Sequence, residues 1–170
     1  MHNKGFTLVE ILTAVIIVTI LTVMAVPLYE KTIERSHLAE ARTIMNRLQE
    51  AKLAAMDNMD CAEYEYGIFS TTHCPHMEHL GVVFMDEKTG QAATGRSFET
   101  KYFKYSLAGE QNTFRNGICA KRLKGDYANT IFAYHQEGNT VEFKCKNQDG
   151  CLDCCESYGY SSDPTLACTF

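Results

Sequence analysis

The stretch GFTLVEILTAVIIVTILTVMAVPL, residues 5–28, decides the fold of this chain. The 23 residues from Phe6 to Leu28 are apolar apart from Glu10 and a few threonines. At a rise of about 1.5 Å per residue, a helix of this length reaches roughly 34 Å, enough to cross a hydrocarbon core of about 30 Å. The sequence therefore predicts a transmembrane helix over 6–28.

Residues 1–5 form a short polar leader in front of this segment. A secretory signal peptide places its apolar core before the cleavage site, whereas here the small residue Gly5 comes first. Cleavage after Gly5 would therefore keep the apolar helix in the mature protein. Lys4 on the leader side favours a cytoplasmic N-terminus under the positive-inside tendency.

Glu10 is the anomaly of the apolar segment. A carboxylate inside a membrane helix costs at least about 2–3 kcal/mol and normally marks function. No Lys, Arg or His lies between Glu10 and Lys31, so the helix itself supplies no counter-charge. Cleavage after Gly5 would give Phe6 an α-amino group with a pKa of about 7.7–8. We predict that this ammonium, on the same subunit or a neighbour, is the partner of Glu10.

The run GFTLVE, residues 5–10, with the apolar stretch that follows it to Pro27, resembles the class III signal sequence of type IV pilins and type II secretion pseudopilins. This resemblance implies that a prepilin peptidase cuts between Gly5 and Phe6 and methylates the new amine of Phe6. It also implies that Glu10 docks each incoming subunit against the N-terminus of its neighbour. The alternative is an ordinary signal anchor, which needs neither Gly-Phe at this boundary nor Glu at this depth.

One position departs from many type IV pilins, which carry a helix-loosening Gly midway between the Glu and the Pro. This chain has Thr19 there, and Thr costs a helix less than Gly does. Pro27 can still kink the helix, because it removes a backbone donor and crowds the preceding turn.

Beyond Pro27 a stripe recurs every three or four residues, at Ile33, His37, Ala41, Ile44, Leu48, Ala51 and Ala55. This is one face of an amphipathic helix. We therefore predict a single helix over 6–58, in which 29–58 belongs to the head. His37 is interpreted as a buried or half-buried core residue rather than a ligand.

The remaining head, 59–170, shows aromatic and β-branched runs separated by turn residues. These runs predict three or four antiparallel strands at 102–107, 117–123, 131–135 and 140–144. The segment 60–99 lacks a sustained period and is predicted as a long loop with one short strand at 81–85. The fold class is then α+β, a long helix packed on a small antiparallel sheet, which the resemblance to pilins also implies.

Eight cysteines, all after the apolar segment, indicate a disulfide framework on the oxidising side of a membrane. They are Cys61, Cys74, Cys119, Cys145, Cys151, Cys154, Cys155 and Cys168.

Five of these cysteines lie in the tail 145–170, which we predict as irregular chain closed by disulfides. Spacing leaves the pairing open. We predict one bridge in the long loop, Cys61–Cys74, and one across the tail, Cys145–Cys168. The adjacent Cys154 and Cys155 are expected to reach different partners.

Two short motifs have the spacing of metal or redox sites. The run HCPHMEH, 73–79, is dense in potential zinc ligands, but its Pro, its loop setting and the expected disulfide at Cys74 favour a solvated loop without metal. Cys151 and Cys154 form a C-x-x-C, yet no strand–helix context is predicted around them, so we interpret them as a structural disulfide.

The composition offers no argument for nucleic-acid binding or catalysis. The net charge is −5, and the small basic group Lys121, Arg122 and Lys124 is interpreted as a solvated strand edge or loop. No Gly-rich phosphate loop, nucleophile elbow or catalytic carboxylate pair occurs. The sequence therefore predicts neither an enzyme nor a cofactor.

Together these features predict a structural subunit of a type IV pilus, major or minor, that polymerises through its N-terminal helix for adhesion, motility or DNA uptake. The alternative is a type II secretion pseudopilin, although the major pseudopilins end in a Gly-rich calcium loop that this tail does not resemble. The expected partners are other pilin subunits, prepilin peptidase, the inner-membrane assembly machinery and, before assembly, lipid. The expected location is the inner membrane, with the head in the periplasm or outside, and then a surface filament.

Overall fold

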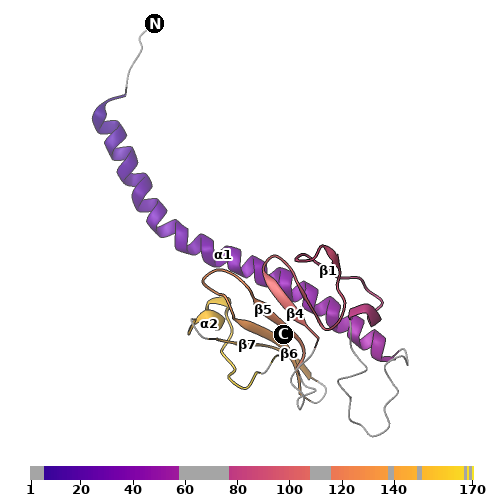
Figure 1. Cartoon of the computed structure of the whole chain (residues 1–170). Helices are drawn as coiled ribbons and strands as arrows, with labels where there is room; N and C mark the ends of the chain where they lie inside the picture. The colour runs from indigo at the N-terminus through magenta and orange to yellow at the C-terminus, as the bar shows by residue number, and fades with distance from the viewer. Residues whose placement is uncertain are drawn as a thin grey trace. The chain divides into compact units, whose positions relative to one another are not determined.

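The structure, a computed structural model, describes residues 6–57, 77–107, 116–137, 140–148, 151–166, 168 and 170. The chain divides into two compact units, Met1–Ser36 and His37–Phe170. Helix α1 (Leu8–Asp57) contributes to both units and confirms the long N-terminal helix (Figure 1).

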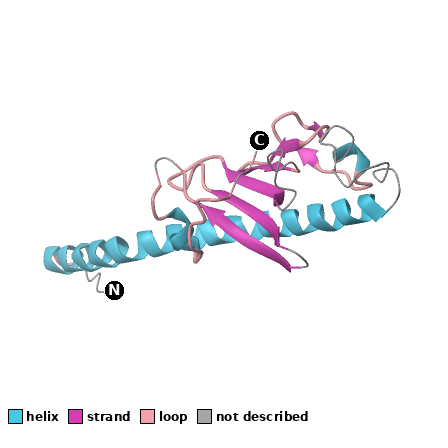
Figure 2. Cartoon of the chain, turned by 90° about the horizontal axis from the view of Figure 1, so that it is seen from below, coloured by secondary structure: helices cyan, strands magenta, loops and turns pink. Residues whose placement is uncertain are grey.

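In the second unit, α1 buries one face against a sheet (Figure 2). The buried positions are Leu38, Ala41, Met45, Leu48, Ala51 and Ala55. The predicted stripe contained all of these positions except Leu38 and Met45, and its member Ile44 is only partly buried. The helix therefore faces the sheet with a stripe shifted slightly from the predicted one.

The main sheet is antiparallel throughout and has the strand order β3-β4-β5-β6-β7. Its strands are β3 (Ser97–Glu99), β4 (Phe103–Ser106), β5 (Asn116–Arg122), β6 (Ile131–Glu137) and β7 (Thr140–Lys146). Four of them match the predicted strands, and β3 is an additional one. An α+β fold with a helix on an antiparallel sheet is thus confirmed.

The prediction of a long loop over 60–99 with one short strand at 81–85 is wrong for its described part, where a strand begins only at Met85 and further elements follow. That part contains η1 (Met77–His79), β1 (Met85–Asp86), β2 (Gln91–Ala92) and β3. These elements are two or three residues long, too short to show a sequence period. Asp86 joins the β1–β2 hairpin to β3, since its carboxylate accepts N–H groups of Lys88 and Thr89 in the β1–β2 turn and of Glu99 in β3.

Aromatic rings fill the space between the sheet and α1. Phe98 stacks on Tyr105 at 4.9 Å between centroids, and Phe132 stacks on Phe143 at 5.7 Å. The hydroxyl of Tyr134 donates to the side-chain oxygen of Asn46 on α1. The large rings therefore supply both apolar burial and a polar link between helix and sheet.

A smaller core lies on the other face of the sheet, where Cys119, Ile131 and Ala133 are covered by Leu166. Cys168 packs against this cluster and forms a disulfide with Cys119. The tail thus closes over the face of the sheet that α1 leaves open.

Two further disulfides lie in the described residues, Cys145–Cys155 and Cys151–Cys154. The predicted Cys145–Cys168 bridge is therefore wrong. Cys145 belongs to the main core with Cys155, whereas Cys168 reaches the opposite face of the sheet with Cys119. A cysteine on one face of a sheet cannot form a disulfide with a cysteine that packs against the other face.

The tail is less irregular than predicted, because it contains helix α2 (Cys154–Tyr158). Gly159 ends this helix with a left-handed φ of 91°, a conformation that favours glycine. As expected, Cys154 and Cys155 have different partners. The other predicted bridge, Cys61–Cys74, lies outside the described residues.

Candidate functional site

The start of α1 is organised around the one carboxylate of the apolar segment. Thr7 precedes the first helical residue, and its backbone N–H and its hydroxyl both donate to Oε2 of Glu10 at 2.9 Å. The backbone N–H of Glu10 in turn lies 3.3 Å from Oγ1 of Thr7. This reciprocal arrangement is a capping box, which satisfies two backbone donors that a helix start otherwise leaves without partners.

The capping box changes the interpretation of Glu10. No Lys, Arg or His lies between Glu10 and Lys31, but a polar partner, Thr7, lies three residues before Glu10. The signal Thr7-x-x-Glu10 in front of an apolar run was present in the sequence and predicts this geometry. The carboxylate is therefore already hydrogen-bonded within its own chain.

The other polar side chains of the apolar segment are also satisfied locally. The hydroxyls of Thr13, Thr19 and Thr22 each donate to the carbonyl four residues earlier, at 3.0, 2.7 and 2.8 Å. A hydroxyl bonded in this way does not need water, so these threonines are compatible with hydrocarbon. Glu10 remains the one ionisable side chain between Phe6 and Tyr29.

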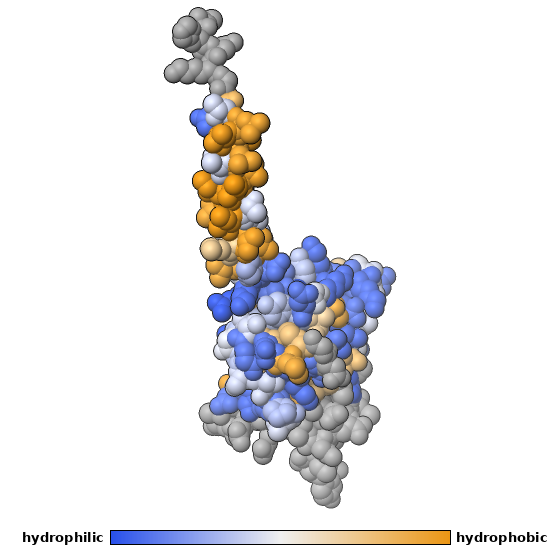
Figure 3. All heavy atoms as spheres, turned by 90° about the vertical axis from the view of Figure 1, so that its left-hand side faces the viewer, coloured by the Kyte–Doolittle hydropathy of each residue, from blue (hydrophilic) through white to orange (hydrophobic). Residues whose placement is uncertain are grey.

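Every residue of the first unit from Phe6 to Thr32 is exposed. Large apolar side chains there expose from 46% (Val26) to 84% (Phe6) of their surface, and Figure 3 shows the helical segment as an almost continuous apolar surface. By length and composition, α1 can cross a membrane. A surface of this kind requires lipid or other protein around it.

Comparison with known proteins bears on this segment. Residues 1–26 match the family model described as the prokaryotic N-terminal methylation motif, the class III signal of type IV pilins. The chain is type IV pilin-like. No solved structure matches it.

The motif indicates a pilin-like protein that is processed by prepilin peptidase and assembles with other pilins. It also fits a membrane-anchored protein that later joins a filament, and it points to a structural role. Of the predicted cleavage and assembly residues, Gly5, a cleavage residue, lies outside the described part of the chain. Phe6, Glu10 and Pro27 lie on the exposed segment, and α1 continues through Pro27.

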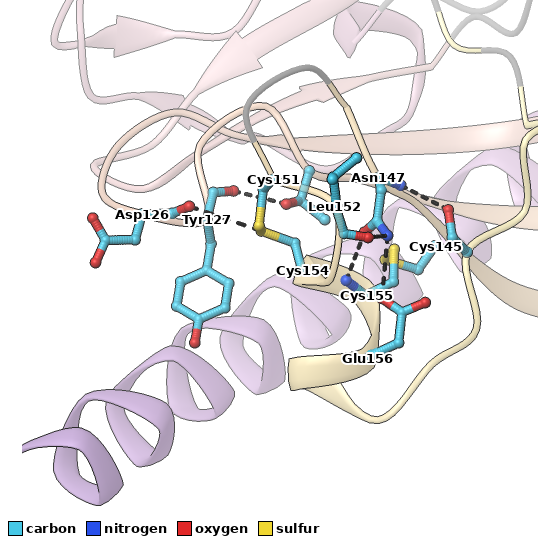
Figure 4. Close-up of a disulfide and its surroundings, with 11 residues drawn as sticks. Asp126, Tyr127, Cys145, Asn147, Cys151, Leu152, Cys154, Cys155 and Glu156 are labelled. Carbon is cyan, nitrogen blue, oxygen red and sulfur yellow. Dashed lines mark hydrogen bonds between the residues drawn. A yellow bond between two sulfur atoms is a disulfide. The ribbon is translucent and has the colours of Figure 1, made fainter.

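A second feature of this pilin-like chain lies between β7 and α2, where the structure describes residues 147–148 and 151–153. Cys145–Cys155 closes its base and Cys151–Cys154 closes its tip (Figure 4). The C-x-x-C thus follows a strand and opens a helix, a context that was not predicted, and its two cysteines are bonded to each other.

Asn147 holds this loop from inside. Its side-chain oxygen accepts the N–H of Cys155 at 2.7 Å, and its amide donates to the carbonyl of Leu152 and to Oε2 of Glu156. Its backbone N–H donates to the hydroxyl of Ser162 at 3.0 Å. The loop is therefore fixed by two disulfides and by nearly the full hydrogen-bonding capacity of one side chain.

The prediction of a solvated strand edge or loop for Lys121, Arg122 and Lys124 is wrong for Arg122. Arg122 is buried, donates to the carbonyl of Tyr102 at 3.1 Å and lies 3.3 Å from Nδ1 of His37. His37 is half-buried and stacks on Tyr102 at 3.9 Å, in agreement with its interpretation as a core residue. Lys121 is half-buried and Lys124 exposed.

The potential metal ligands His73, Cys74 and His76 lie outside the described residues. Within the described part of the chain, no group of three or more His, Cys, Asp or Glu side chains is placed to hold a metal ion.

Proposed function

We propose that this chain is a structural subunit of a type IV pilus, which leaves the membrane and polymerises through residues 6–28 after its leader is removed. The observation that carries the proposal is an exposed apolar helix whose one ionisable group is held in a capping box at its start. Lipid would cover this helix before assembly and neighbouring copies would cover it afterwards.

Glu10 and Phe6 would act together at the assembly step. Cleavage after Gly5 would create an α-amino group on Phe6, directly before the Thr7 N–H that already binds the carboxylate of Glu10. A nearby ammonium would compensate the carboxylate in hydrocarbon, where either charge alone is costly. The same carboxylate could then exchange this partner for the N-terminus of a neighbouring subunit, with Pro27 providing the bend.

The disulfide-rich head supports a pilus rather than a secretion pseudopilin. A filament exposed outside the cell meets proteases and mechanical load, and disulfides in the tail keep the head closed under these conditions. We assign the chain no enzymatic role. In this proposal the head lies in the periplasm or outside, and the partners are other pilin subunits, the peptidase and the inner-membrane assembly machinery.

The first test is the intact mass of the membrane-extracted full chain after co-expression with a prepilin peptidase. We expect loss of residues 1–5 and addition of one methyl group at Phe6. A chain that keeps its leader beside an active peptidase would refute the proposal.

The second test locates the polymer in the presence of an assembly system. A pilus subunit appears in filaments sheared from the cell surface, whereas a pseudopilin stays with the cell. Glu10→Ala should abolish polymer in both cases, and Glu30→Ala, at an exposed position of the same helix, serves as the matched control.

A further inference from the structure

We propose that the disulfide Cys151–Cys154 is a thiol-exchange site, at which the dithiol of another protein reduces the bridge while the head stays folded. This inference goes beyond the proposed function and does not depend on polymerisation. Its starting observation is the C-x-x-C itself, which has the spacing of dithiol redox sites. The motif follows β7 and leads into α2, and a strand followed by a helix is the setting in which such sites occur.

The two sulfur atoms of this bridge differ in their access to solvent. Cys151 is half-buried, and the residues that follow it, Leu152 and Asp153, are exposed. Cys154, the first residue of α2, is fully buried. In thiol–disulfide exchange an incoming thiolate attacks the sulfur that it can reach, and the other sulfur leaves. Cys151 is therefore the sulfur that is attacked, and Cys154 is the sulfur that leaves.

The leaving sulfur has a neighbour that only the reduced form can use. Sγ of Cys154 lies 3.8 Å from the backbone carbonyl oxygen of Asp126, a contact that Figure 4 shows as a dashed line. A disulfide sulfur carries no hydrogen, so the bridged form cannot donate to this oxygen. After reduction the thiol of Cys154 can donate to it, which gives the buried S–H group an acceptor. The fold thus already provides for the reduced state of this cysteine.

Contacts around the bridge would remain when it opens. The disulfide Cys145–Cys155 still closes the base of the segment, and the side-chain oxygen of Asn147 still accepts the N–H of Cys155 at 2.7 Å. Cys151 and Cys154 are only three residues apart, so opening frees a short segment around Leu152. The side chain of Leu152 is 86% exposed and has little packing to lose. Reduction of this bridge is then a local opening and not an unfolding of the head.

The other two disulfides of the described residues lack this combination of access and local opening. Cys145 and Cys155 are both fully buried in the main core, so a thiolate cannot reach either sulfur. Cys168 is half-buried, but it packs against the smaller core beside Leu166, and breaking its bond to Cys119 would release the tail from the sheet. Accessible disulfides are the ones that exchange, whereas buried ones persist.

The exchange transfers two electrons from the dithiol to this chain. One thiolate of the dithiol attacks Sγ of Cys151, the bond between Cys151 and Cys154 breaks with its electron pair on Cys154, and Cys154 takes a proton. The second thiolate of the dithiol then attacks the dithiol's own sulfur in the mixed disulfide and releases Cys151, which also takes a proton. The dithiol has become a disulfide, and the chain carries two thiols in place of its bridge.

Limited reduction of the unaltered full chain in mild detergent tests this site. The probes are dithiothreitol, as a small dithiol, and reduced thioredoxin, as a protein dithiol; free thiols are alkylated and located by peptide mass mapping. We expect Cys151 and Cys154 to be labelled at a reductant concentration about tenfold or more below that needed for the other two described bridges, with the thermal transition of the head retained. Labelling of all three bridges together, labelling only after the transition is lost, or reduction by dithiothreitol but not by thioredoxin would overturn the proposal.

Two single substitutions test which sulfur is attacked. Cys154→Ser leaves the thiol of Cys151, and Cys151→Ser leaves the thiol of Cys154, so each variant lacks the same bridge and is the control for the other. We expect Cys154→Ser to form a mixed disulfide with oxidised glutathione about tenfold or more faster than Cys151→Ser, because its free sulfur is the accessible one. Equal rates, or a faster reaction at Cys154, would overturn the two roles. Neither assay uses a peptidase or a filament, so their failure would leave the proposed function untouched.

Discussion

Removing the Cys119–Cys168 disulfide should destabilise the head much more than removing Cys151–Cys154. Cys119 and Cys168 are 49 residues apart in sequence, and Cys151 and Cys154 are three apart. Because the Cys145–Cys155 bridge lies inside the first loop and bypasses 10 of its residues, the effective length of that loop is about 40 residues. Chain entropy then gives about 4 kcal/mol for the first bridge and about 2 kcal/mol for the second. The difference corresponds to roughly 6–10 °C in melting temperature for a unit of this size.

The assay is thermal or denaturant unfolding of the full chain in detergent, with the double variants Cys119→Ala/Cys168→Ala and Cys151→Ala/Cys154→Ala. Cys119 and Cys154 are both fully buried, so the cavity left by alanine is similar in the two variants and nearly cancels in the comparison. Equal losses in the two variants, or a larger loss at the C-x-x-C, would refute the argument from loop length.

Three further outcomes follow from single contacts. Thr7→Val should reduce filament assembly at least severalfold while Thr7→Ser retains it, because only the hydroxyl completes the capping box, and sheared-filament yield measures this. Arg122→Ala should lower the free energy of unfolding by about 2–4 kcal/mol, against about 0.5 kcal/mol or less for the exposed Lys124→Ala, as denaturant unfolding would show. Hydrogen bonds from Thr165, and then Lys144, hold the pKa of the Asp163 carboxyl below its ordinary value. The stabilisation that this carboxylate gives the folded head is therefore present above the ordinary pKa, and it is lost as the pH falls through the lowered pKa. Asp163→Asn should therefore weaken the acid dependence of unfolding between about pH 5 and 2, and an unchanged dependence would contradict this origin.

The sequence was most informative where one period continues over many residues. The apolar segment, the stripe through Ala41 and Leu48 and the four longer strands all have enough residues to display a pattern. The strands β1, β2 and β3 do not, because three residues or fewer cannot establish alternation. Their positions depend instead on Asp86, whose three backbone partners come together only in the folded head.

The disulfide pairing could not be predicted from the sequence for a different reason. Which cysteine Cys168 meets depends on which face of the sheet the tail crosses, and that choice is made by Leu166 packing over Ile131 and Ala133. Cysteine spacing contains no information about faces. The burial of Arg122 was missed for a similar reason, because its contacts Tyr102 and His37 lie far from it in sequence.

The capping box also bears on how assembly would be driven. If Glu10 had no partner before cleavage, the new amine of Phe6 would relieve a large penalty and the cleaved subunit would be trapped in its first ion pair. With Thr7 already donating two hydrogen bonds to Oε2, the proposed cleavage would give the carboxylate an additional partner instead of its first one. The Thr7 hydrogen bonds would be kept whichever amine pairs with Glu10, so exchanging one amine for another would never leave the carboxylate without a donor. On the proposed function, the carboxylate would pass from one amine to the next without an unpaired intermediate, and burial of the apolar helix would supply the rest of the stability of the polymer.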